Sequence, residues 1–218
     1  MRQALDIRGD ARHAGTVRSW WQLSVTMSLV AILAGVIFAP SPTLADPAAA
    51  ASAAAGAGSD LVGTTPPAWA LGDWIGSSPL TLGKLRGKVV LLRWFTDTSC
   101  PYCSLTAPAL NQLHQDFAGR GLVVIGVYHH KRNEALDLSA VRGWARDYGF
   151  HFPVAVDRDW RTLHRWWLDG HQRDFTSVSF LIDRHGVIRQ VHPGGTLALG
   201  TPDFEAMRAR IDQLLGGS

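Results

Sequence analysis

The sequence predicts an α/β domain in which a mixed central sheet carries helices on both faces. Two apolar runs rich in β-branched residues, Val89–Phe95 and Leu122–Tyr128, are typical of buried strands. A helical pattern separates these runs, so the two strands are expected to be parallel. Two later strands are expected to pair antiparallel around residues 184–186. Alternating strands and helices followed by an antiparallel pair indicate a mixed sheet.

The remaining elements follow in order along the chain. Trp74 and Ile75 are expected to form a short hairpin with residues 80–82. A first helix is expected over residues 103–118, with Leu105, Ala109, Leu110 and Leu113 on its inner face. After it come a helix over 139–148, a strand over 154–156, a short helix over 160–168, hairpin strands over 177–183 and 187–191, and a final helix over 202–215. Most of Trp160, Trp166 and Trp167 are expected in the core.

The amino-terminal segment, residues 1–45, reads as a signal peptide or a membrane anchor. Basic residues ending at Arg18 precede an uncharged apolar run over 20–39, and residues 43–45 have the small side chains that a signal peptidase favours. The run is longer than most cleaved signals and close to the length of a membrane span, so both interpretations stay open. Residues 46–60 are rich in Ala and Gly and predict a flexible linker before a folded domain over 61–218.

These features point to the cell envelope, with the domain periplasmic or on the outer face of the membrane, either anchored or secreted. Of the net charge of +3, +2 derives from the amino-terminal segment, and basic and acidic residues nearly balance in the remainder. Because no basic patch with interleaved aromatic residues stands out, nucleic acid is not an expected partner. The histidines show no metal-ligand spacing, and neither a metal nor a cofactor is expected.

The chemistry is expected at Cys100 and Cys103, which are the two cysteines of the chain. They lie where a buried strand gives way to a helix, and the amides of a helix amino terminus favour a thiolate at the first position. The second cysteine, about one turn away, can displace a partner from a mixed disulfide. A structural disulfide is the alternative, but so small a ring constrains an unfolded chain little. A redox-active Cys100–Cys103 disulfide is therefore predicted.

Four nearby residues are candidates for tuning the thiols. Asp97 could accept the proton of the second cysteine, or it could cap the turn or the helix. His129 and His130 follow a strand that ends at the same edge of the sheet, so one imidazole could reach the thiolate. Paired histidines in a loop are also often solvated. Tyr102, between the cysteines, could influence the redox potential or belong to a permissive turn.

Five segments in order resemble the redoxin group of thioredoxin-fold proteins, most of all the exported, membrane-tethered thiol-disulfide oxidoreductases of the TlpA and ResA type. The segments are residues 82–92, the Cys-Pro-Tyr-Cys motif, and residues 121–127, 152–157 and 180–188. The group shares its fold with the AhpC/TSA peroxiredoxins. The resemblance implies a thioredoxin-like three-layer α/β/α fold, a nucleophilic Cys100, a resolving Cys103, protein disulfide or dithiol substrates and a recycling redox partner.

Several positions depart from the patterns of these relatives. Ser99 stands where Trp usually precedes the first cysteine. Thr176 and Ser177 occupy the substrate-facing loop, with Ser177 in place of a cis-proline. A non-proline cis bond costs about 2.5 to 4 kcal/mol, so the Thr176–Ser177 bond is expected to be trans. Arg93 and Asp97 replace the Pro and Thr/Ser of a peroxiredoxin site, and Ser177 stands where peroxiredoxins place an Arg.

Three functions are compatible with this pattern. The first is an exported thiol-disulfide oxidoreductase. The second is a thiol peroxidase of the AhpC/TSA type, in which Cys100 passes through a sulfenic acid and Cys103 closes the disulfide. The third is a copper-binding metallochaperone that uses both cysteines with His129 or His130, since soft thiolates and imidazole suit copper.

Overall fold

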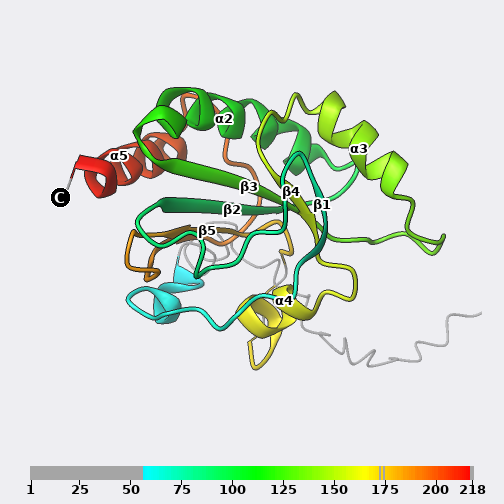
Figure 1. Ribbon diagram of the computed structural model, residues 1–218, viewed down its shortest axis with the longest axis horizontal. Helices are drawn as coiled ribbons and strands as arrows, with labels where there is room; N and C mark the ends of the chain where they lie inside the picture. The colour runs from blue at the N-terminus through cyan, green and yellow to red at the C-terminus, as the bar shows by residue number, and fades with distance from the viewer. Residues whose placement is uncertain (1–55, 172, 174, 217–218) are drawn as a thin grey trace, which may run out of the picture. The chain divides into compact units, whose positions relative to one another are not determined.

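The computed structural model describes residues 56–171, 173 and 175–216 (Figure 1). The predicted signal or anchor and most of the predicted linker, residues 1–55, lie outside the described residues. Over the part of the chain that is described, no helix has the length and apolar character needed to cross a membrane.

Six strands form one mixed sheet in the order β1-β4-β3-β2-β5-β6. β2, β3 and β4 are parallel, whereas β1 pairs antiparallel with β4, β5 with β2 and β6 with β5. The strands are β1 (Gly72–Ile75), β2 (Val89–Phe95), β3 (Leu122–Tyr128), β4 (Val154–Val156), β5 (Ser179–Ile182) and β6 (Ile188–His192). The predicted parallel pair and the predicted closing hairpin are confirmed.

Helices lie on both faces of this sheet, as predicted (Figure 1). One face is covered by α2 (Pro101–Phe117), α3 (Leu138–Asp147) and α5 (Pro202–Gly216). The other face carries α4 (Arg161–Leu163), which runs on into a π-helical turn, η3 (His164–Leu168). Two short 3-10 turns, η1 (Ser59–Leu61) and η2 (Ala118–Arg120), complete the described elements.

The central strand β2 is buried on both faces because its side chains alternate between two cores. Val89 and Leu91 pack against α2 and α5, whereas Trp94 and its neighbours at alternate positions pack against Trp166 and Trp167. This double burial explains why the strand is an uninterrupted apolar run apart from Arg93. Trp160 is only partly buried at the edge of the same core.

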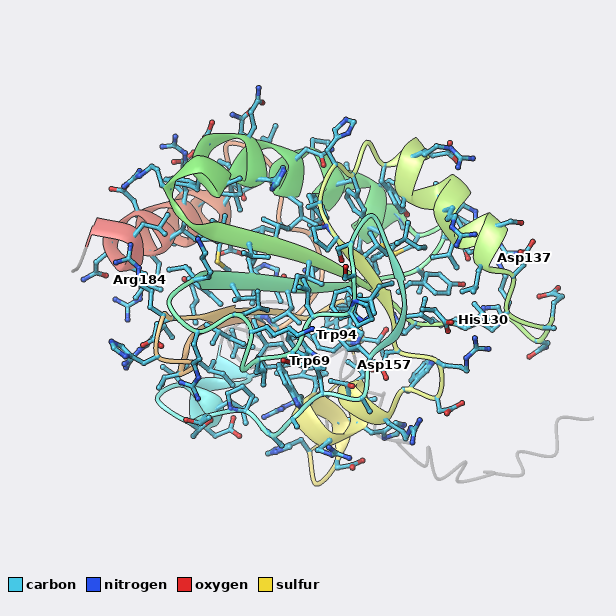
Figure 2. All side chains as sticks on the ribbon, in the orientation of Figure 1. Trp69, Trp94, His130, Asp137, Asp157 and Arg184 are labelled. Carbon is cyan, nitrogen blue, oxygen red and sulfur yellow. The ribbon has the colours of Figure 1, made fainter. Side chains whose placement is uncertain are left out.

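A buried carboxylate joins β2 to the start of α4 (Figure 2). Asp157, directly after β4, is fully buried. It accepts hydrogen bonds from Trp94 Nε1 at 3.2 Å and from the backbone N–H groups of Thr162 and Leu163 at 3.1 and 2.7 Å. Donors that would otherwise be unsatisfied at the helix start are therefore paired.

The predicted hairpin of Trp74 and Ile75 with residues 80–82 is wrong. β1 pairs instead with β4, far along the chain. Residues 81–87 turn back on themselves, and the Lys84 N–H donates to Thr81 Oγ1 at 3.2 Å. Leu80 and Leu82 pack their side chains against the core between the sheet and α4, and their backbone groups do not form a strand pair.

The inner face of α2 also differs from the prediction at one position. The helix begins at Pro101 and continues through Pro108, and Ala109, Leu110 and Leu113 are buried as expected. Leu105, however, is 57% exposed. Thr106 takes the inward position because its hydroxyl meets the buried side chain of Arg93 at 3.4 Å.

Candidate active site

Cys100 is the N-cap residue of α2. Its Sγ accepts a hydrogen bond from the Cys103 N–H at 3.3 Å, and the backbone N–H of Cys100 donates to the Asp97 carbonyl at 3.1 Å. Pro101 occupies the first helical position, where its missing N–H leaves no gap. A 17-residue helix therefore points its amino terminus at a sulfur atom that remains partly exposed.

Cys103 lies one turn into α2 and is buried. Its Sγ is 3.8 Å from the hydroxyl of Thr96. Burial, together with the contact with Cys100, raises the pKa of the Cys103 thiol to about 11. The two sulfurs thus differ in access, because one faces solvent and the other lies behind it.

The loop between β2 and α2 is held by Asp97. Its carboxylate accepts hydrogen bonds from the Ser99 N–H at 2.9 Å, from the Ser99 hydroxyl and from Arg132 Nε at 3.0 Å. Burial by itself would raise the pKa of Asp97, but the Ser99 and Arg132 hydrogen bonds outweigh it and lower the pKa to about 2. These bonds make Asp97 the acceptor that fixes the turn before Cys100.

Tyr148, which sequence reasoning did not single out, anchors the same loop from the end of α3. Its hydroxyl donates to the Asp97 carbonyl at 2.7 Å. Burial raises the pKa of Tyr148, and the neighbouring Cys103 acts in the same direction. The signal for this role is weak in the sequence, because a Tyr before Gly149 at a helix end is an ordinary core residue.

His129 lies between the end of β3 and the loop before β5. Its Nδ1 donates to the Phe95 carbonyl at 3.0 Å, so Nε2 is left as the acceptor for the Thr176 hydroxyl at 2.8 Å. Burial lowers the pKa of His129 to about 3. The imidazole is therefore neutral and holds Thr176 in place.

His130 is engaged in a similar way at the carboxyl end of β3 (Figure 2). Its Nε2 donates to the Glu134 carbonyl at 2.7 Å, so Nδ1 accepts from the Tyr128 hydroxyl at 2.9 Å. The ring nitrogens of both histidines are used in these contacts. A hydrogen bond from either imidazole to a cysteine is not among those of the described residues.

The loop before β5 lies beside the first turn of α2. The rings of Tyr102 and Phe175 meet edge to face with centroids 5.8 Å apart. Tyr102 and Phe175 are 44% and 37% exposed, whereas Ser177 is buried. Tyr102 therefore lies on an exposed apolar surface next to Cys100 and contacts the loop that contains Thr176 and Ser177.

Arg93 is the other residue whose role sequence reasoning missed. Its guanidinium is buried under α2, where it donates to the Gly195 carbonyl at 2.7 Å and to Thr106 and Ser179 at 3.4 and 3.2 Å. A charged residue inside an apolar strand is the signal that could have drawn attention to it. Within residues 56–171, 173 and 175–216, no group of three or more His, Cys, Asp or Glu side chains is placed to hold a metal ion.

A six-stranded mixed sheet with a cysteine pair at the amino end of α2 is a thioredoxin-like fold, and the chain belongs to the AhpC/TSA family, whose model matches residues 62–191. A solved thioredoxin-like superfamily protein is 27% identical, with a TM-score of 0.58 over 71% of this chain and 97% of its own. A thiol-disulfide isomerase from Corynebacterium glutamicum is 26% identical, with a TM-score of 0.55 over 70% of this chain and 97% of its own.

The chain is also similar in sequence to thiol-disulfide oxidoreductases. ResA of Geobacillus kaustophilus is 29% identical over 133 residues, which are 61% of this chain and 70% of ResA. Protein DipZ of Mycobacterium tuberculosis is 29% identical over 157 residues, which are 70% of this chain. The chain spans only 21% of the length of DipZ. The chain is thus a homologue of thiol-disulfide oxidoreductases.

Proposed function

We propose that the protein is an exported thiol-disulfide oxidoreductase that exchanges disulfides with protein substrates through Cys100-Pro-Tyr-Cys103. The observation that carries the proposal is the hydrogen bond from the Cys103 N–H to Cys100 Sγ at 3.3 Å, at the amino terminus of α2. An anionic sulfur at that point is stabilised by the helix amides, and the thiolate is the nucleophile of disulfide exchange.

The two sulfurs would act in sequence. The Cys100 thiolate attacks a substrate disulfide, forms a mixed disulfide and expels one substrate sulfur, which takes up a proton from water. Cys103 then loses its proton, attacks Cys100 Sγ and releases the second substrate sulfur, which is protonated in turn. Two electrons pass from the protein dithiol to the substrate, and a redox partner must return the Cys100–Cys103 disulfide to the dithiol. The reverse sequence oxidises a substrate dithiol.

A polypeptide substrate is supported by the surface beside Cys100. Tyr102, Leu105 and Phe175 are large apolar side chains that are exposed, by 44%, 57% and 37%. Tyr102 and Leu105 belong to the first turns of α2, and Phe175 contacts Tyr102. Export is supported by the basic and apolar amino-terminal pattern of residues 1–45. A fusion of residues 1–60 to a reporter enzyme active only outside the cytoplasm should be active.

The match to the AhpC/TSA family supports a second candidate function, that of a thiol peroxidase. Arg93 and Asp97 stand where peroxiredoxins carry Pro and Thr/Ser, and both side chains are committed to other contacts. A wild-type protein that reacts with hydrogen peroxide no faster than a free thiol would remove this candidate. Rapid reaction would favour it over disulfide exchange.

The proposed exchange is tested by trapping in the full-length protein. Cys103→Ser should accumulate mixed disulfides with other proteins through Cys100, because the resolving thiol is missing. Cys100→Ser, the matched control, should accumulate far fewer, because Cys103 is buried. The wild-type protein should also catalyse the reduction of insulin by dithiothreitol. Absence of both trapped species and insulin reduction contradicts the proposal.

A further inference from the structure

Arg93 is a buried cation that has only neutral partners. Its side chain is 1% exposed. Its guanidinium donates to the Gly195 carbonyl, to the hydroxyls of Ser179 and Thr106, and lies 3.5 Å from His192 Nδ1. Its Nε has no hydrogen-bond partner, and no carboxylate pairs with it, among residues 56–171, 173 and 175–216. Burying a charge without an opposite charge beside it raises the free energy of the folded state.

The two sulfurs are groups whose negative charge could offset the charge of Arg93. The carboxylate of Asp203, whose side chain is 71% exposed, lies on the far side of His192, 3.6 Å from the His192 Nε2. Thr106, which the guanidinium contacts, lies one turn beyond Cys103 on the inner face of α2. Burial lowers the pKa of Arg93 to about 10, while negative charge on Cys103, and then on Cys100, acts in the opposite direction. Negative charge on the cysteine pair therefore favours the charged form of Arg93 beneath α2.

The other ionisable groups around the pair contribute no comparable positive charge. His129 and His192 are neutral at physiological pH, because burial lowers the pKa of His129 to about 3 and that of His192 to about 4. Tyr148 is an uncharged phenol at this pH, and burial raises its pKa further. The Asp97 anion is already paired with Arg132. At neutral pH, Arg93 is thus the fixed positive charge behind Cys103.

Cys103 must become an anion for resolution, and among the described residues no carboxylate or imidazole is hydrogen-bonded to its sulfur. Burial raises the pKa of its thiol to about 11. Asp97, which the sequence suggested as a proton acceptor, has its carboxylate occupied by Ser99 and Arg132, and those hydrogen bonds lower its pKa to about 2 despite burial. A carboxylate so strongly held in its ionised form is a poor proton acceptor.

We propose that Arg93 is a positioning residue of the redox site, which stabilises the Cys103 thiolate during resolution of the mixed disulfide in place of a general base. This inference rests on the proposed disulfide exchange. The Cys103 S–H bond breaks and its proton passes to water. The sulfur then bonds to Cys100 Sγ, and the substrate sulfur leaves and is protonated by water. Arg93 makes and breaks no covalent bond, and its charge lowers the free energy of the transient anion.

The experiment follows the two steps with a small disulfide, 5,5′-dithiobis(2-nitrobenzoic acid), and the reduced full-length protein. Attack by Cys100 releases one coloured thionitrobenzoate, and resolution by Cys103 releases a second, so the rate of the second release reports the inferred step. In Arg93→Met the second release should slow by about tenfold or more at pH 7, the change in thiolate population that accompanies one pKa unit. The pH midpoint of this rate should rise. Arg93→Lys should restore most of the rate and the midpoint.

Two further variants serve as controls for the loss of the Arg93 charge. Arg93→Gln removes the charge but keeps a hydrogen-bond donor, and it should behave like Arg93→Met, which covers the case in which Met does not fold. Arg208→Met removes the same charge at the surface, where Arg208 pairs with Asp116, and should leave the second release unchanged. Folded neutral variants with wild-type rates and pH midpoints overturn the role of Arg93. A wild-type protein without a second release overturns the proposed function itself.

Discussion

At the scale of single residues, the two cysteines are chemically unequal although only two residues separate them. Cys100 Sγ is partly exposed and caps α2, whereas Cys103 is buried beside Thr96, and burial raises the pKa of its thiol to about 11. An incoming disulfide therefore meets Cys100 first. Cys103 then lies within one helical turn of the mixed disulfide that Cys100 forms.

Asp97 should contribute to stability through the turn that it caps. Asp97→Ala removes the acceptor of the Ser99 N–H and of Arg132, and we expect the free energy of unfolding at pH 7 to fall by about 1 kcal/mol in urea denaturation. The pKa of this carboxylate is lowered to about 2 in the folded protein by the hydrogen bonds that outweigh burial. Its contribution is therefore present above the unfolded pKa, near 3.8, and is lost as the pH falls towards 2.

A surface aspartate provides the control for this prediction. Asp212 pairs with Arg120 where both side chains are well exposed. Asp212→Ala should therefore change the unfolding free energy little. An Asp97→Ala protein as stable as the wild type at pH 7 would contradict the capping role.

At the scale of elements, the start of α4 depends on one buried carboxylate from another part of the chain. Asp157 accepts from the Trp94 side chain and from two backbone N–H groups at the beginning of α4. The three donors come from two elements, so their common acceptor fixes how α4 meets β2. This contact stabilises the face of the sheet opposite α2.

Loss of the Asp157 carboxylate should strongly destabilise the folded protein. Asp157→Ala leaves three buried donors without an acceptor, and we expect the free energy of unfolding to fall by about 3 kcal/mol. Asp159→Ala is the matched control, because Asp159 is an exposed aspartate two residues away whose partner Arg161 is 3.7 Å distant. Equal unfolding midpoints for the two variants in urea would show that Asp157 does not organise α4.

At the scale of the whole domain, two buried histidines link distant segments in their neutral form. His129 joins β3 to the loop before β5 through Thr176, and His192 on β6 contacts Arg93 of β2. Burial lowers the pKa of both imidazoles, to about 3 for His129 and about 4 for His192. The folded protein therefore resists protonation that the unfolded chain accepts.

Stability should consequently fall with acidification. Between the unfolded value near 6.5 and the lowered pKa values, protons bind to the unfolded state only, so the free energy of unfolding should fall as the pH drops below 6.5. The slope should approach about 1.4 kcal/mol per pH unit for each histidine. Urea denaturation from pH 7 to pH 5 measures it. His192→Gln should show a shallower slope, and a slope equal to that of the wild type would contradict this account.

Much of the sheet was predictable because its strands are buried on both faces. β2 and β3 are continuous apolar runs, and β5 with β6 is a hairpin around a short polar turn. The partner of β1 is not predictable, because pairing across about 80 residues leaves no local trace in the sequence, whereas residues 80–82 are a nearby apolar run. Helical periodicity predicts Leu105 on the inner face because it takes no account of the buried Arg93, whose guanidinium contacts Thr106 there.

The candidate site was predictable only in part for a similar reason. Cys100 and Cys103 are recognisable from spacing and from the strand before them. The surroundings of Arg93 are not, because its shortest hydrogen bond reaches Gly195, which lies 102 residues further along the chain. Asp97 and His129 are candidates by their positions in the sequence, but the residues that bind their side chains, Arg132 and Thr176, are distant in the chain and could not be read from it.

The central claim is that Cys100 is the accessible nucleophile and Cys103 the shielded one. The most direct measurement is the rate at which each thiol of the reduced wild-type protein is alkylated by iodoacetamide at pH 7, followed residue by residue by mass spectrometry. Cys100 should react at least about tenfold faster than Cys103, as expected for a helix-capping sulfur in contact with solvent. Faster alkylation of Cys103, or equal rates at the two positions in the folded protein, would contradict the account.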